Sequence, residues 1–170
     1  GVASFISSQY ANGTQLAVGA QLAVASAIRR SWVPARRALV FGAGRDSRMV
    51  CAAATTGAPR GRAVFVEDSP EWAALVRADL KAYLSAQNLP EDSCVVKDVT
   101  YGTHRAHWAE WLGRGPELAQ RVLDQINEER QSFDVVVVDG PCGCNDLCPG
   151  RMAPLAAAVE LAAPDHGVVF

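Results

Sequence analysis

The chain is 170 residues long, 49% of them hydrophobic and 20% charged, with a formal net charge of −2. This length fits one globular domain that buries roughly 70% of the surface of its unfolded chain. There is no basic cluster with interleaved aromatic residues, and no apolar run approaches the roughly 20 residues that a membrane span needs. We therefore expect neither a nucleic-acid partner nor a membrane-spanning segment in this sequence.

The first half of the chain alternates between helix and strand patterns. Helical spacing of apolar residues predicts a helix over 14–30, with its apolar positions at Leu16, Val18, Leu22, Val24 and Ile28. An apolar run at 37–41 predicts a strand, which a helix over 46–56 follows, and residues 63–66 predict a second strand. Ser69-Pro70-Glu71 is a typical helix start. The apolar positions expected in that helix are Trp72, Leu75, Val76, Leu80 and Leu84.

The second half continues the same alternation. Its expected elements are a strand over 94–96, helices over 116–130 and 149–163, and strands over 133–138 and 167–170. The four consecutive valines before Asp139 are typical of a strand buried on both faces of a parallel sheet. The sequence therefore predicts a doubly wound α/β fold.

A Gly-x-Gly turn, Gly42-Ala43-Gly44, ends the first strand. Such a turn after a strand is typical of nucleotide-binding α/β folds, because glycine lets backbone N–H groups come close to a ligand. The third glycine of a dinucleotide-binding loop is replaced by Ser47. We therefore expect a different adenosine-containing ligand; a tight turn with no ligand is the alternative.

Acidic residues follow the second and third strands. Glu67 comes 25 residues after Gly42 and is the predicted ligand of ribose hydroxyls, with Asp68 beside it. Capping of the next helix is the alternative role, which Asp68 or Ser69 could also fill. Asp98 could contact the adenine edge or serve only in a turn.

Two further segments carry groups suited to acid–base chemistry. Asp139, at the end of the most apolar strand, is the candidate active-site carboxylate, and a turn residue before Gly-Pro is the alternative. Residues 101–105 offer hydroxyl, imidazole and guanidinium groups. His104 or His107 could act as a base, although a lone histidine is more often a surface or packing residue.

The cysteines allow several states. The chain has five of them: Cys51, Cys94, Cys142, Cys144 and Cys148. The last three lack a second Cys/His pair at a zinc-ligand spacing, so we expect no metal site. A disulfide within this loop or simple packing is favoured, and an odd count leaves at least one thiol unpaired if the others pair.

Five blocks of sequence occur in an order that is specific as a set. They are LVFGAGRDS (39–47), VFVEDSPEW (64–72), VTYGT (99–103), FDVVVVDGPCG (133–143) and PGRM (149–152). Over about residues 14–170 the chain resembles the plant glucuronoxylan 4-O-methyltransferase family, also called the polysaccharide biosynthesis domain. The resemblance implies a Rossmann-like class I methyltransferase fold, a three-layer sandwich around a mostly parallel sheet.

The same resemblance implies S-adenosylmethionine as cofactor and methyl transfer to glucuronic acid residues of an acidic polysaccharide such as xylan. The implied cofactor contacts are Gly42, Gly44, Asp46, Ser47, Glu67, Asp68 and Asp98. Asp139 is the first candidate for the catalytic base and His104 the second. Arg151 would bind the sugar carboxylate through its guanidinium fork, or cap a helix instead, and Tyr101 would be a further substrate contact.

Departures from the family pattern leave other interpretations open. The sequence stops at Phe170, in the fifth expected strand, which indicates one methyltransferase-like domain that is incomplete at its C-terminus. Cys144 replaces a family tyrosine, which affects acceptor specificity. A non-catalytic factor for xylan assembly is the main alternative, and Ser47 disfavours a nicotinamide-dependent dehydrogenase. The resemblance implies the Golgi lumen, and the oligomeric state stays open.

Overall fold

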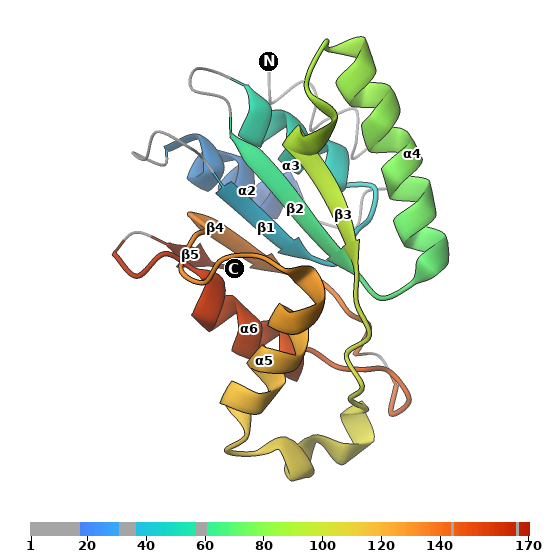
Figure 1. Ribbon diagram of the computed structural model, residues 1–170, viewed down its shortest axis with the longest axis vertical. Coiled ribbons are helices and arrows are strands. Elements are labelled where there is room, and N and C mark those ends of the chain that lie inside the picture. The colour runs from blue at the N-terminus through green and yellow to red at the C-terminus, as the bar shows by residue number, and fades with distance from the viewer. Residues whose placement is uncertain (1–17, 31–36, 57–60, 144, 166) are drawn as a thin grey trace.

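The computed structural model describes residues 18–30, 37–56, 61–143, 145–165 and 167–170. In this part of the chain, parallel strands form one sheet in the order β3-β2-β1-β4-β5 (Figure 1). The strands are β1 (Arg37–Phe41), β2 (Arg62–Glu67), β3 (Cys94–Asp98), β4 (Val135–Val138) and β5 (Val168–Val169). The α-helices are α2 (Val18–Arg30), α3 (Ser47–Thr55), α4 (Pro70–Ala86), α5 (Gly115–Ile126) and α6 (Met152–Leu161), and the 3-10 helices are η1 (Glu91–Ser93) and η2 (Arg105–Trp111). The predicted α/β fold class is confirmed.

The helices cover both faces of the sheet and make three layers (Figure 1). Successive strand residues point to opposite faces, so each strand contributes to two cores. Val40, Phe65 and Val137 pack with α2, α3 and α4 on one face. Phe41 and Val136 pack with α5 and α6 on the other. This double burial explains why the central strands consist of continuous apolar residues.

Most element boundaries agree with the sequence predictions to within a few residues. The helix expected over 116–130 ends at Ile126, because Asn127 adopts the left-handed conformation (φ 49°) that terminates helices. The helix expected from residue 149 begins at Met152. Residues 14–17 of the first expected helix lie outside the described residues.

Two predicted helix faces were partly wrong. In α2, Gln21 is fully buried and its Nε2 donates to Asp46 Oδ1 at 3.4 Å, whereas Leu22 is 41% exposed. In α4, Trp72 and Leu75 are 39% and 62% exposed. The buried positions of α4 are Ala73, Val76, Leu80 and Leu84, one stripe at spacings of three and four residues.

Two disulfides connect the described cysteines. Cys142–Cys148 closes the loop after β4, which confirms one of the two states expected for this loop. Cys51–Cys94 joins α3 to β3 within the core, a pairing that the sequence did not predict. Cys144 lies outside the described residues.

None of the described helices is both long and apolar enough to cross a membrane.

Candidate cofactor and acceptor site

The candidate site lies at the carboxyl edge of the sheet, where β1, β2 and β4 end. The segments that follow β1 and β4 lead to helices on opposite faces of the sheet, which makes this position a topological switch point. Open α/β sheets bind their ligands in the crevice at such a point. A cavity of about 360 Å³ opens there. Its lining consists of Gly42, Ala43, Glu67, Asp68, Ser69, Trp72, Asp139, Gly140, Pro141, Cys142 and Arg151.

Two glycines let the loops after β1 and β4 touch at the cavity wall. A Cβ on Gly42 would lie 2.7 Å from the backbone nitrogen of Gly140, and a Cβ on Gly140 would lie 2.8 Å from the Cα of Gly42. Gly42 also has a φ of +103°, which side-chain-bearing residues rarely adopt. Gly140 N donates to Phe41 O at 2.7 Å, so the contact is bonded as well as close. Gly42 is therefore required by backbone packing in addition to any ligand contact.

Glu67 holds the loop after β1 with its carboxylate. The side chain is 8% exposed, its Oε2 accepts from Ala43 N at 2.6 Å and its Oε1 accepts from Ser69 N at 2.8 Å. Each carboxylate oxygen has two lone pairs, so both can still accept a ligand hydroxyl. The two alternatives for Glu67 are thus compatible, since one carboxylate can fix the loop and also face a ribose.

Asp46 and Ser47 form the start of α3 just behind the loop. Both are buried, and Ser47 Oγ accepts from Gly44 N at 3.1 Å. With Gly44 and Asp139 they line a recess of about 20 Å³ next to the main cavity. The structure therefore brings together the four residues predicted for the methionine side of the cofactor, Gly42, Gly44, Asp46 and Ser47, around one point.

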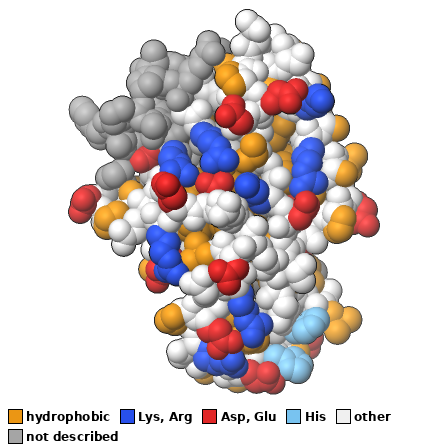
Figure 2. Space-filling model, viewed as in Figure 1, with side chains coloured by type: hydrophobic (Ala, Val, Ile, Leu, Met, Phe, Trp, Pro, Cys, Tyr) orange, Lys and Arg blue, Asp and Glu red, His pale blue; other side chains and the backbone are white. Residues whose placement is uncertain are grey.

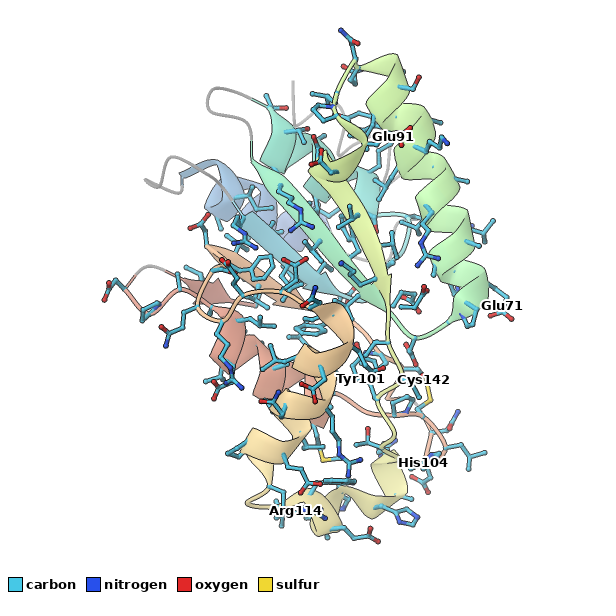
Figure 3. All side chains as sticks on the ribbon, in the orientation of Figure 1. Glu71, Glu91, Tyr101, His104, Arg114 and Cys142 are labelled. Atoms are coloured by element: carbon cyan, nitrogen blue, oxygen red, sulfur yellow. A yellow bond between two sulfur atoms is a disulfide. The ribbon has the colours of Figure 1, made fainter. Side chains whose placement is uncertain are left out.

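Asp68 and Tyr101 lie close to Glu67 but differ in their access to the cavity. Asp68 lines the cavity, and partial burial raises the pKa of its carboxyl. Tyr101 is 3% exposed and is absent from the lining, and its hydroxyl has no hydrogen-bond partner among the described residues. Burial, followed by the charges of Asp68 and Glu67, raises the pKa of Tyr101, so the phenol stays neutral. Figure 3 shows Tyr101 on the segment that leaves β3.

Asp98 and His104 lie outside the cavity lining. Asp98 is exposed and accepts from Arg77 Nη2 at 2.6 Å, although its backbone pairs in register with Glu67. His104 is exposed, and its Nδ1 lies 3.1 Å from the carbonyl oxygen of Leu147 (Figure 3). Their predicted roles in adenine binding and catalysis stay predictions, which these positions outside the lining do not support.

Asp139 and Arg151 meet at the mouth of the cavity. Arg151 Nη2 donates to the carbonyl oxygen of Asp139 at 2.8 Å, and both side chains belong to the lining. Arg151 is exposed, so the remaining donors of its guanidinium are accessible. The arrangement places a carboxylate able to accept a proton beside a cation able to bind an anionic group.

Sequence reasoning gave Trp72 no role in the site, and it named Gly140, Pro141 and Cys142 only as the turn after Asp139, although all four line the cavity. Trp72 was assigned to the core because it fits the helical spacing, although it stands in the first turn of α4, directly beyond the acidic end of β2. Residues of a first helical turn at the carboxyl edge of a sheet face the ligand crevice. That position is the signal that could have identified Trp72.

Comparison with known proteins supports the assignment of family and fold. A family model described as IRX15/IRX15L/GXM matches residues 20–167. Arabinogalactan O-methyltransferase 1 from Arabidopsis thaliana is 30% identical over 152 residues, which is 84% of this chain and 50% of the relative. The chain thus spans half the length of this curated relative.

A solved structure has the same fold. The crystal structure of an O-methyltransferase from Bacillus cereus in complex with SAH matches with a TM-score of 0.55 at 16% identity, over 97% of this chain and 63% of that chain. At this identity the likeness concerns the fold, which is the Rossmann-like fold of class I methyltransferases.

Proposed function

The chain belongs to the IRX15/IRX15L/GXM family, and we propose that it is the cofactor-binding part of an O-methyltransferase. The proposed cofactor is S-adenosylmethionine, and the proposed acceptors are glucuronic acid residues of a xylan-like cell-wall polysaccharide. One observation carries the proposal: the cavity at the switch point is lined by the carboxylates of Glu67, Asp68 and Asp139.

This set of carboxylates fits the charge of the cofactor. S-adenosylmethionine has a positive sulfonium and a positive ammonium group, which three carboxylates attract. The pyrophosphate of a nicotinamide dinucleotide would be repelled by the same groups, so the cavity disfavours the dehydrogenase alternative. Glu67 would hold the ribose, and the backbone of Gly42 and Gly44 would hold the methionine side.

The catalytic work of the chain's own residues is positioning and proton removal. Bound S-adenosylmethionine would supply an electrophilic methyl carbon. Asp139 would accept the proton of the acceptor hydroxyl, and Arg151 would bind the carboxylate of the sugar. Arg151 is hydrogen-bonded to the backbone of Asp139, so a sugar bound to Arg151 would be held at a fixed position relative to the base. This would lower the entropic cost of aligning the acceptor hydroxyl with Asp139.

We also propose the Golgi lumen as the site of action. The support from the structure is its two disulfides, Cys51–Cys94 and Cys142–Cys148. Disulfides persist in the oxidising secretory compartments and are rare in the cytosol.

Replacing Asp139 with asparagine tests the proposal in the full-length protein. Calorimetric titration with S-adenosylmethionine should detect binding to the wild type and to the variant, whereas methyl transfer to glucuronoxylan oligosaccharides should be lost in the variant. Asp124→Asn, on the exposed face of α5, is the control and should behave as wild type.

Three outcomes contradict the proposal in different ways. Turnover by Asp139→Asn at the wild-type rate would remove Asp139 as the base. No cofactor binding to the wild type would favour the non-catalytic assembly factor. Transfer to arabinogalactan oligosaccharides alone would replace the proposed acceptor.

A further inference from the structure

In the part of the chain that the structure describes, two arginines beside the candidate site form no ion pair with an acidic side chain. Seven other described arginines form ion pairs, namely Arg37, Arg48, Arg62, Arg77, Arg114, Arg121 and Arg130. Within the same described residues, Arg105 and Arg151 form no ion pair with a carboxylate, and both are exposed. Their charges are therefore left for a ligand to neutralise.

The backbones that carry these two arginines lie next to each other. A Cβ on Gly150, the neighbour of Arg151, would lie 3.8 Å from the Cα of Arg105 and 3.7 Å from its Cβ. Arg105 N also donates to Cys148 O at 2.8 Å. The segment that leads into η2 is thus bound to the end of the loop that the Cys142–Cys148 disulfide closes.

Both guanidinium groups are fixed by the same connection, residues 139–151 between β4 and α6. Arg105 Nη1 donates to Gly143 O at 3.1 Å, and Arg151 Nη2 donates to Asp139 O at 2.8 Å. A guanidinium has five N–H donors, so each keeps several for a ligand. Two cations held by one connection, one of them in the cavity lining and the other just outside it, favour an anion between them.

We propose that Arg105 is a specificity-determining residue, which binds the carboxylate of the acceptor sugar together with Arg151. The inference rests on the proposed function and extends it to a residue outside the cavity lining. Arg151 at the mouth and Arg105 across the disulfide-closed loop form a two-guanidinium clamp for a uronic acid. A neutral sugar offers no charge to this clamp, so the clamp selects acidic acceptors.

The test compares an acidic probe with its neutral counterpart in the full-length protein. The probes are a glucuronic-acid-substituted xylo-oligosaccharide and the same oligosaccharide after reduction of its carboxyl group, with binding measured by calorimetry. Arg105→Gln should weaken binding of the acidic probe roughly two- to fivefold, as expected for an exposed charged contact. It should leave binding of the reduced probe and of S-adenosylhomocysteine unchanged.

Two further variants control for charge and for structure. Arg105→Lys keeps the charge and should restore part of the affinity for the acidic probe. Arg114→Gln removes an exposed arginine that is paired with Glu117 and should change neither affinity.

The outcomes separate this inference from the proposed function. Equal weakening of both probes by Arg105→Gln, or no weakening of either, overturns the clamp. Absence of S-adenosylhomocysteine binding by the wild type overturns the proposed function instead. The comparison of the acidic and the reduced probe then still decides whether the clamp exists.

Discussion

Glu67→Gln separates the two roles of the buried carboxylate. In the wild type its two oxygens accept from Ala43 N at 2.6 Å and from Ser69 N at 2.8 Å. Glutamine keeps one oxygen and places an NH₂ group against the other backbone N–H. One buried donor then loses its acceptor, and the remaining bond loses its charge. Hydrogen bonds to charged groups contribute about 1.5–3 kcal/mol each, so we expect the free energy of unfolding to fall by about 2–3 kcal/mol.

The same substitution should weaken cofactor binding beyond its effect on folding. A ribose hydroxyl bound to glutamine instead of a carboxylate loses about 2 kcal/mol, which corresponds to a roughly 30-fold higher Kd for S-adenosylhomocysteine. Urea unfolding without ligand measures the first effect, and calorimetric titration under folding conditions measures the second. Glu91→Gln is the matched control, because Glu91 is 83% exposed and far from the cavity lining.

Three results would refute parts of this reasoning. An unchanged Kd with reduced stability would show that Glu67 only fixes the loop. An unchanged stability with a raised Kd would show that the two backbone bonds contribute little. Equal effects of Glu91→Gln would show that the changes reflect net charge and not position.

Three more variants test the two disulfides and the buried phenol near the site. Replacing Cys51 and Cys94 with serine should lower the free energy of unfolding by about 4 kcal/mol, because this disulfide closes a loop with a sequence separation of 43 residues. Replacing Cys142 and Cys148 with serine should lower it by about 2 kcal/mol, because their separation is 6 residues. Urea unfolding without reductant measures both losses, and equal losses would contradict the loop-entropy argument. Tyr101→Phe should not lower stability at neutral pH, since the buried hydroxyl has no partner among the described residues. Burial raises the pKa of Tyr101 in the folded protein, so the free energy of unfolding falls as the pH rises past about 10, where the tyrosine of the unfolded chain ionises. Urea unfolding at several pH values should show a shallower decline of this free energy in the Phe variant. An unchanged decline would contradict the argument.

The sequence predicted the elements that local chemistry determines. The strand at 37–41 and the helix start at Ser69-Pro70 are where the structure has them, because an apolar run and a capping residue act within a few positions. Ser69 Oγ accepts from Trp72 N, as a helix cap does. The positions of Glu67 and Asp139 in the cavity followed from these strands, since the ends of parallel neighbours meet at one edge.

Features that depend on distant contacts could not be predicted in the same way. Gln21 can be buried because a polar partner, Asp46, stands 25 residues away at the N-cap of α3. Cys51–Cys94 requires α3 and β3 to be packed in the sheet before the two sulfurs meet. The sequence places the guanidinium of Arg105 in a segment rich in functional groups, but only the folded chain shows that it reaches the carbonyl of Gly143 and pairs with no carboxylate among the described residues.

The topology of the fold places the acidic and the basic side chains of the site in different positions. Acids stand at strand ends, where the ladder of the sheet fixes Glu67 and Asp139 and the backbone N–H groups next to α3 and α4 compensate for the burial of Glu67. Arginines stand beyond the same edge, on the connections that carry Arg105 and Arg151. Under the proposed function, a cationic cofactor would therefore be attracted to the inside of the cavity and an anionic acceptor to the arginines outside it. Under the proposed function, opposite charges would bring the two ligands to adjacent places, so they would not compete, and the hydroxyl to be methylated would lie next to Asp139.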